Sequence, residues 1–425
     1  MTKPKFYGWK LVAVLFLLYL AASIALYGGN IANTYMAKLM NMSRSLFGAG
    51  FAAAYLLVGL GSALAAVVTN KKGERFTLSL GMAGITAGAL LMALWGQSTV
   101  GYILFFGIII GTGFAFATVL PIQTIITRWF QRKRALATAV VLSAGGIGGI
   151  VSAPLVNKLI ESTNGNWKLA WIYMAVLGVI ITVVSAFFTR NNPVDMGQVP
   201  DGIEQQSPGA NVEAKKVRKA YVYQAQESWT LKEAIKTVPL WIIILAAIGQ
   251  FFGFYLCIGH GVIHLMDLGV TNETAALSLG ILAFASIGGR LLSGILGDRI
   301  EPRFVIMGGL LLTIAGCFLI INATTIFTIY LYAILVGAGF GLVYVCLFTM
   351  LGNYYGAEKI QNFLGFMIPI VTLFGASAPL IGGIVKDKTG SYTGAFIGTV
   401  VIAVIGFISL FFASPPIKDK DKNKE

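Results

Sequence analysis

Charged residues are scarce in this 425-residue chain. They make up 11% of it, against 57% hydrophobic residues, whereas about a quarter of the residues in a typical soluble domain are charged. A soluble protein of this length is therefore excluded. The short alternating segments of a membrane β-barrel are missing too, while the apolar stretches are long enough to cross a bilayer as helices. The sequence predicts an all-α integral membrane protein.

Cysteine and histidine are also few. The three cysteines, Cys257, Cys317 and Cys346, all lie in apolar stretches, so no disulfide framework is expected. The two histidines, His260 and His264, are spaced i, i+4, but no third ligand accompanies them and we predict no metal site. The apolar stretches hold no nucleophile–base pair or metal cluster, so we expect neither an enzyme nor a bound cofactor.

Acidic residues are fewer than basic ones, and the net charge is +14. Such a balance is common in nucleic-acid-binding proteins, but lysine and arginine also collect on the cytoplasmic side of membrane proteins. With the N-terminus inside, 24 of the 31 basic residues are cytoplasmic, Arg290 lies within a span, and six are external: Lys38, Arg44, Lys158, Lys168, Lys386 and Lys388. We therefore expect a multi-pass protein of the inner (plasma) membrane with both termini cytoplasmic. Its partner is the lipid bilayer and not a nucleic acid.

Hydrophobic runs bounded by polar turns predict twelve membrane spans. They cover about 9–30, 46–69, 77–95, 100–126, 136–158, 168–189, 239–263, 274–297, 303–322, 325–350, 361–385 and 393–413. The longest gap divides them six and six, which predicts a first half over 1–189, a cytoplasmic linker over 190–238, a second half over 239–413 and a cytoplasmic tail over 414–425. Near the end of the linker, Thr230 and Glu233 have the spacing of a capping box and predict a short helix.

The two halves are related in sequence. The segment VVTNKKGERF at 67–76 aligns with GILGDRIEPRF at 294–304 at an offset of 228. The segment SAPL at 152–155 recurs at 377–380, at an offset of 225. Similar offsets at separate places indicate a duplicated six-span unit. Because six is even, the two copies have the same orientation in the membrane.

Arg290 stands alone in the middle of an apolar run. The first acid downstream, Asp298, is eight residues on, which places the guanidinium roughly 12 Å inside the helix end and near the midplane of the bilayer. An ionised arginine there costs at least about 2.5 kcal/mol unless water or an anion accompanies it. Of the seventeen acids, sixteen fall in predicted loops or tails and Asp267 lies at a helix margin. Between a structural ion pair and a substrate anion, this distribution favours the anion.

The loop after the eighth span resembles the hallmark loop of the major facilitator superfamily. Its residues are Gly294, Leu296, Asp298, Arg299 and Arg303. The resemblance implies two pseudo-twofold bundles of six helices, and it implies gating and helix docking for Asp298, Arg299 and Arg303.

A narrower resemblance covers most of the chain. The segments FYGW at 6–9, RWFQRKRALA at 128–137 and SIGGRLLSGILGDR at 286–299, in this order, are similar to bacterial monocarboxylate transporters and the related oxalate/formate antiporters. The substrate arginine of that family maps to Arg290. The family's animal members carry a lysine late in span one and an aspartate one turn before the arginine, whereas this chain has Gly29 or Asn30 and Ser286 there.

The number of cations indicates the charge of the substrate. The planar fork of an arginine matches one carboxylate, and a dianion such as oxalate should be held by two cations. Span eleven, which is expected to supply the second cation in oxalate/formate antiporters, has none within it. This favours L-lactate, pyruvate or a similar small monocarboxylate. Asn30, Tyr344, Tyr27 and His260 are further candidates for contact with the substrate.

Proton coupling has few candidates, because the spans hold no mid-depth acid. His260, His264 and Asp267 lie at the external end of span seven, and histidine changes charge near neutral pH. The proton could instead travel with the substrate. The sequence therefore predicts a proton-coupled monocarboxylate symporter that works by alternating access, with a monomer sufficient. A carboxylate/carboxylate antiporter is the alternative, and a transport-dead solute sensor is a more distant one.

Overall fold

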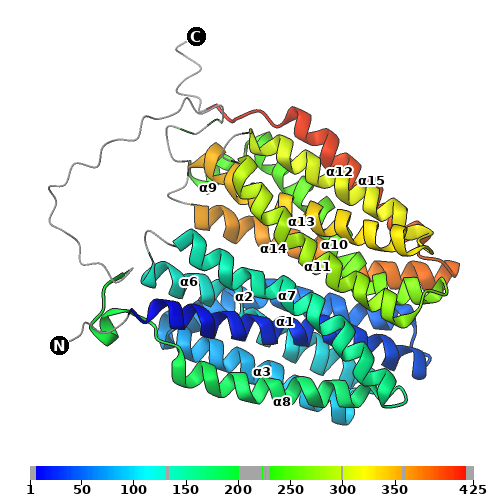
Figure 1. The fold of residues 1–425 in the computed structure, drawn as a ribbon. Coiled ribbons are helices and arrows are strands. Elements are labelled where there is room, and N and C mark those ends of the chain that lie inside the picture. Colours follow the sequence, from blue (N-terminus) through cyan, green and yellow to red (C-terminus); the bar gives the residue numbers. More distant parts are fainter. Residues whose placement is uncertain are drawn as a thin grey trace, which may run out of the picture. The chain divides into compact units, whose positions relative to one another are not determined.

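The computed structural model describes residues 6–130, 134–200, 223, 225, 229–297, 300–356 and 360–417 (Figure 1). The chain forms two compact units, Met1–Lys216 and Val217–Glu425. The division falls inside the segment 190–238 that the sequence assigns to a linker.

Helices account for the secondary structure of both units, and the described ranges contain no strand. Twelve helical segments of 20 to 32 residues are long and apolar enough to cross a membrane. Twenty residues span about 30 Å, the thickness of the hydrocarbon core. The predicted all-α architecture with twelve spans is thus confirmed. Helices suit this setting because they satisfy every backbone hydrogen bond within the segment.

The first unit contains eight α-helices and one π-helical segment among its described residues. They are α1 (Gly8–Leu39), α2 (Arg44–Lys72), α3 (Glu74–Trp95), α4 (Thr99–Gly101), the π-helical segment Tyr102–Ile110, α5 (Gly111–Ala117), α6 (Val119–Trp129), α7 (Arg134–Ser162) and α8 (Trp167–Phe188). In Figure 1, α1 lies along α7 and α3 lies along α8.

The fourth span of this unit is broken at Thr118. The break separates α5 from α6 and precedes Pro121 by three residues. Proline has no N–H to donate and its ring clashes with the carbonyl four residues earlier, so the helix cannot continue unbroken through this point. The Thr118 hydroxyl donates to the carbonyl of Phe114 at 2.7 Å, which satisfies one of the acceptors at the break.

The second unit contains seven α-helices among its described residues. They are α9 (Leu231–Ala234), α10 (Val238–Asp267), α11 (Asn272–Gly297), α12 (Pro302–Ile321), α13 (Ile326–Tyr355), α14 (Ile360–Thr389) and α15 (Thr393–Ser409). The predicted capping box is present at α9, where Thr230 and Glu233 bond each other's backbone N–H. Helix α13 packs against α11 and α12, and α10 packs against α14 and α15 (Figure 1).

Glycines let α11 and α13 touch backbone to backbone. A Cβ added to Gly289 would lie 3.0 Å from the Cα of Gly341, and a Cβ on Gly341 would lie 2.7 Å from the backbone nitrogen of Arg290. Close approach through small residues is a common mode of association for membrane helices. Here it sets the distance between Arg290 and the side chains of α13.

Adjacent glycines on α11 provide a test of this contact. Gly289→Ala should destabilise the protein by about 1–3 kcal/mol, because the added methyl group overpacks the contact with α13. Gly288→Ala has open space around its Cβ and should be neutral, or stabilising by up to about 1 kcal/mol, because alanine is the better helix former. The midpoint of thermal unfolding in detergent, measured for both variants, compares them. Equal midpoints would contradict the packing described here.

Candidate functional site

Arg290 lies on α11, seven residues before the helix ends at Gly297. This corresponds to about 10 Å along the axis, so the residue is inside the apolar part of the span and nearer the end at which α12 begins. The neighbouring polar residues on α11 are already bonded. Ser286 donates to the carbonyl of Ala283 at 2.7 Å, and Ser293 donates to the carbonyl of Leu342 on α13 at 3.0 Å.

The guanidinium of Arg290 contacts two aromatic rings of α13. Its central carbon is 5.1 Å from the ring centroid of Tyr344 and 5.8 Å from that of Phe340. Its Nε is buried and has no hydrogen-bond partner, and within the described parts of the chain no carboxylate lies within 4.0 Å of it. Cation–π contact stabilises the charge by only about 0.5–2 kcal/mol and leaves the N–H edge unsatisfied. Arg290 is therefore positioned but has no counter-ion.

The rings beside Arg290 belong to a larger aromatic cluster between α10 and α13. Phe340 stacks on Phe254 with a centroid distance of 3.6 Å, and it meets Phe251 edge-on at 5.3 Å. Tyr344 packs against Phe340 at 5.5 Å and against Phe348 at 5.1 Å. The cluster fixes the plane of the Tyr344 ring, so the predicted pair Arg290 and Tyr344 is brought together on a rigid surface.

His260 is fully buried and bonded through both ring nitrogens. Its Nε2 is 2.6 Å from the carbonyl of Pro379 on α14, and its Nδ1 is 2.8 Å from the hydroxyl of Tyr392. A carbonyl only accepts, so Nε2 carries the hydrogen. In the neutral ring Nδ1 then accepts a hydrogen bond from Tyr392. The ring thus joins α10 to α14 and to the residue that precedes α15.

His264 and Asp267 lie on the same helix as His260. Nε2 of His264 is 2.9 Å from the carbonyl of Ile320 on α12, and its ring packs edge-on against Tyr392. Asp267 forms an ion pair at 3.4 Å with Lys386 of α14, whose ammonium lies 5.3 Å from the ring centroid of Tyr392. The three predicted proton-coupling residues therefore share one cluster with Tyr392 and Lys386, two residues that the sequence patterns do not point to.

His260 and Arg290 lie at different depths of the unit. A short connection joins the end of α10 at Asp267 to the start of α11 at Asn272, so the two helices run in opposite directions. His260 is about 10 Å from that connection and Arg290 about 27 Å, a difference of about 17 Å along the helices. A molecule the size of lactate cannot bridge this distance.

Tyr27 and Asn30 lie on α1, in the first unit, whereas Arg290 belongs to the second unit. Asn30 is buried and its carbonyl accepts a hydrogen bond from Thr34 at 3.0 Å, whereas Tyr27 is half-buried. Asn33, almost one turn further along α1, is fully buried, and neither polar atom of its side chain has a hydrogen-bond partner.

Two of the three predicted gating residues, Asp298 and Arg299, lie outside the described residues. Arg303 is described, and its Nη1 donates to the carbonyl of Ala413 at 3.3 Å. Arg75, which aligns with Arg303 at the offset of 228, makes the equivalent bond in the first unit, where its Nε donates to the carbonyl of Ala186 at 2.5 Å. In each unit an arginine at the start of the third span thus bonds a carbonyl at the end of the sixth.

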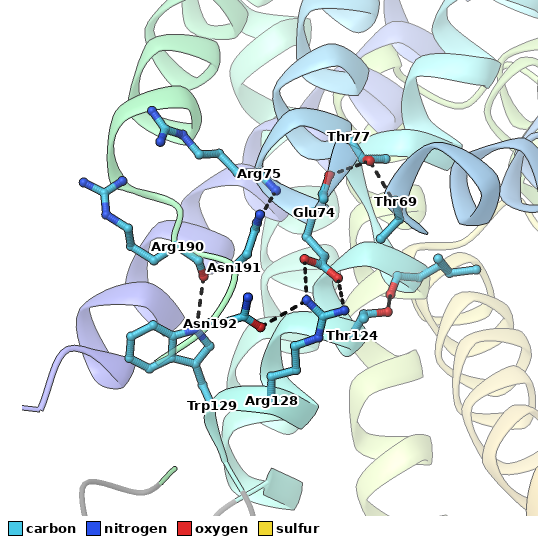
Figure 2. A network of polar contacts seen from close by, with 12 residues as sticks. Thr69, Glu74, Arg75, Thr77, Thr124, Arg128, Trp129, Arg190, Asn191 and Asn192 are labelled. Carbon is cyan, nitrogen blue, oxygen red and sulfur yellow. Dashed lines mark hydrogen bonds and ion pairs between the residues drawn. The ribbon is translucent and has the colours of Figure 1, made fainter. Parts of the chain in front are cut away.

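Glu74 is a buried acid that the sequence analysis assigned to a loop. Gly73 ends α2 with φ +84, a conformation that glycine adopts without strain, so that Glu74 can begin α3. The Glu74 side chain is completely buried and pairs with both terminal nitrogens of Arg128, at 3.0 and 2.9 Å (Figure 2). Arg128 also donates to Asn192 at 3.2 Å. The partners are 54 residues apart, and no local signal joins them.

Twelve apolar spans in two compact units define a polytopic membrane protein, and Arg290 lies well inside one of these spans without a described carboxylate beside it. The family model described as the Major Facilitator Superfamily matches residues 14–367 and 262–425. The chain therefore belongs to this superfamily, whose members are transporters and not enzymes.

Relatives and solved structures agree with this assignment. The chain is 26% identical over 371 residues to monocarboxylate transporter 13 of Bos taurus, which covers 85% of this chain and 80% of that protein. It is 25% identical to monocarboxylate transporter 2 of Homo sapiens, covering 81% of this chain and 72% of that protein. The fold is similar to a bacterial homologue of the human lysosomal transporter Spinster in an inward-facing, occupied conformation, with a TM-score of 0.73, 16% identity and coverage of 96% and 97%. It is also similar to the nucleoside transporter NupG, with a TM-score of 0.72, 15% identity and coverage of 96% and 98%.

The Glu74–Arg128 pair should respond unequally to loss of its two members. Arg128→Gln leaves a fully buried carboxylate without a counter-ion and should cost about 3 kcal/mol or more of folding free energy. Glu74→Gln leaves an arginine whose side chain is 42% exposed and can be hydrated, so the cost should be nearer about 1 kcal/mol. Thermal unfolding of the purified protein measures both.

The double variant serves as the control for this pair. Glu74→Gln with Arg128→Gln removes both charges and should recover much of the stability lost in Arg128→Gln alone. Equal losses in the two single variants, with no recovery in the double variant, would show that the ion pair does not stabilise this end of the unit.

Proposed function

We propose that this protein carries small monocarboxylates across the membrane by alternating access, and that Arg290 binds the substrate carboxylate. The observation that carries the proposal is the guanidinium of Arg290, which is held inside a membrane span with a buried Nε that has no partner and no described carboxylate nearby. An intramembrane charge of this kind is expensive and is usually functional. A substrate anion supplies the missing counter-ion.

The geometry of Arg290 suits a carboxylate. Tyr344 and Phe340 contact the guanidinium, so its orientation is restrained before the substrate arrives. Arginine can present two parallel N–H donors to the two oxygens of a carboxylate, and it stays charged at working pH. The hydroxyl of Tyr344 makes no hydrogen bond within the described residues and provides a further donor on the same surface.

The presence of one cation, Arg290, at the proposed site supports a substrate with a single negative charge. Within the described part of α14 the basic residues are Lys386 and Lys388, both in its last turn. A dianion at Arg290 would therefore lack a second cation from this helix. The similarity to proteins named monocarboxylate transporters supports the same substrate class.

For proton coupling we propose the pair of His260 and Tyr392. Nδ1 of His260 faces a hydroxyl, which can accept as well as donate a hydrogen bond, so protonation of Nδ1 needs only a rotation of the Tyr392 O–H. The described titratable side chains that the contacts place in or next to this cluster are His264 and Lys386, which lie against Tyr392, Asp267, which pairs with Lys386, and Tyr332, which faces Gly261. Asp267 is the only acid among them, and it already pairs with Lys386.

Carboxylate exchange, or entry of the proton on the substrate itself, is the second candidate. One observation favours it: both ring nitrogens of His260 are already bonded in the neutral state, so the ring has no need of a proton. In this case His260 serves only to hold α10 against α14.

For the orientation we propose that both termini are cytoplasmic and that the protein lies in the plasma membrane. The distribution of lysine and arginine supports this arrangement, because Lys71, Lys72 and Arg75 lie around the start of α3 and Arg190 follows the end of α8.

Uptake of labelled L-lactate into proteoliposomes tests the substrate. We expect an inward proton gradient to stimulate uptake and an ionophore to abolish the stimulation. Arg290→Gln should lower uptake by at least about thirtyfold, because one partner of a buried charge pair is lost, and Arg290→Lys should retain part of it. Lys388→Gln, which removes a positive charge from the end of α14, is the matched control and should transport normally.

Three results would change this assignment. A folded Arg290→Gln variant with normal uptake would remove Arg290 from the site. Lactate flux that appears only with a carboxylate inside the vesicles would favour the exchanger. A complete lack of lactate flux in the unmodified protein would exclude lactate as the substrate.

The pH dependence of uptake tests the proton site. In the unmodified protein we expect uptake to rise as the external pH falls from about 8 to about 5, the range in which histidine titrates. His260→Gln can still donate to the Pro379 carbonyl but cannot titrate, so the pH profile should flatten while substrate binding persists. His264→Gln should keep the original profile. An unchanged profile in both variants would assign the proton to the substrate.

A further inference from the structure

A basic pocket lies in the first unit where α3 begins and α8 ends. It has a volume of about 240 Å³ and is lined by Lys72, Arg75, Phe76, Ser79, Ala186 and Asn191. Pockets for drug-sized ligands usually exceed about 300 Å³, so this one suits a smaller group such as a phosphate. It belongs entirely to the first unit and does not include Arg290.

The two cations that line the pocket, Lys72 and Arg75, and Arg190, which precedes the lining residue Asn191, keep donors unused. Arg75 bonds the Ala186 carbonyl through Nε, and Arg190 bonds the carbonyls of Phe187 and Thr189 through Nη1, at 2.7 and 3.0 Å. The Nη groups of Arg75, Nη2 of Arg190 and the ammonium of Lys72 have no partner among the described residues. In Figure 2 the side chains of Arg75 and Arg190 both point away from the Glu74–Arg128 pair. The only acid beside them in sequence, Glu74, is occupied by Arg128.

Helix capping explains only part of this arrangement. Cations near the C-terminus of a helix bond its last carbonyls and interact favourably with its dipole, as Arg75 and Arg190 do at α8. Capping does not account for Lys72, which comes from α2, or for two lining cations with Arg190 beside them in the chain and no described carboxylate paired with any of the three. An anion in the pocket would use the remaining donors.

Exposed apolar side chains continue from the pocket along both helices. On α3, Phe76 and Leu80 are 47% and 46% exposed, and on α8, Val179, Val183 and Phe187 are 50–64% exposed. Their spacing of three or four residues places each set on one face of its helix. Helices α3 and α8 pack along each other, so their exposed apolar faces form one surface. The basic pocket lies at one end of this surface.

We propose that this pocket binds the phosphate of an anionic phospholipid, with the acyl chains lying along the exposed faces of α3 and α8. Arginine can contact two phosphate oxygens at once, and basic pockets between membrane helices on the cytoplasmic side are suited to anionic headgroups. With the proposed orientation the lipid comes from the inner leaflet. A soluble phosphate compound would use the same cations but would leave the apolar surface uncovered.

Lipid binding to the purified full-length protein tests the proposal. Native mass spectrometry should show more bound phosphatidylglycerol than phosphatidylcholine with identical acyl chains. Removing cations with Lys72→Gln, Arg75→Gln and Arg190→Gln should weaken phosphatidylglycerol binding roughly fivefold for each cation. The matched control, Lys158→Gln with Lys168→Gln, removes two charges at the other end of the same unit and should change binding by less than about twofold.

Two outcomes would overturn the lipid site. One is equal binding of the two lipids by the unmodified protein, a result that does not depend on how well any variant folds. The other is inorganic phosphate displacing the lipid at equal concentration, which would assign the pocket to a soluble anion. Neither measurement involves lactate flux, so both can fail or succeed independently of the function proposed for Arg290.

Discussion

A buried ionised side chain must be matched by water or by an opposite charge, and this constraint separates two charged residues of the protein, Glu74 and Arg290. Glu74 satisfies it within the fold, because both terminal nitrogens of Arg128 reach its carboxylate. Arg290 does not, since it has aromatic rings beside it and no described carboxylate. The lack of a described counter-ion at Arg290 is the basis for our proposal that a substrate anion binds there, because such a counter-ion must be able to leave.

Close packing of α11 against α13 holds Arg290 beside the aromatic side chains of α13. Gly289 and Gly341 bring α11 and α13 into backbone contact, and Ser293 bonds across the same interface. As a result Arg290 projects over Tyr344, whose ring is held by the cluster that includes Phe254 and Phe340. The side chain is thus positioned by neighbouring aromatic rings, an arrangement that would lower the entropy cost of binding the anion that we propose as its ligand.

The two units share one arginine-to-carbonyl hydrogen bond and differ in where their buried charged and titratable residues lie. Arg75 and Arg303 occupy equivalent positions, and each bonds a carbonyl at the end of the sixth span of its own unit. This bond is part of what the duplicated halves retain. The intramembrane cation and the cluster around His260 are found in the second unit, whereas the buried ion pair and the basic pocket belong to the first. The features that we assign to the substrate and those that we assign to the lipid thus lie in different units.

The sequence by itself determined the twelve spans, the all-helical architecture and the isolation of Arg290. These are local properties: a run of apolar residues of sufficient length must be helical in a bilayer, and the lack of mid-depth acids can be read by inspection. The tertiary structure decided which side chains meet. Glu74 is buried by an arginine 54 residues away, and His260 is held by Pro379 and Tyr392, which are 119 and 132 residues away. Tyr344 lies beside Arg290 only because glycines on both helices let them approach. Such contacts depend on how helices pack, and helical periodicity and composition do not record that packing.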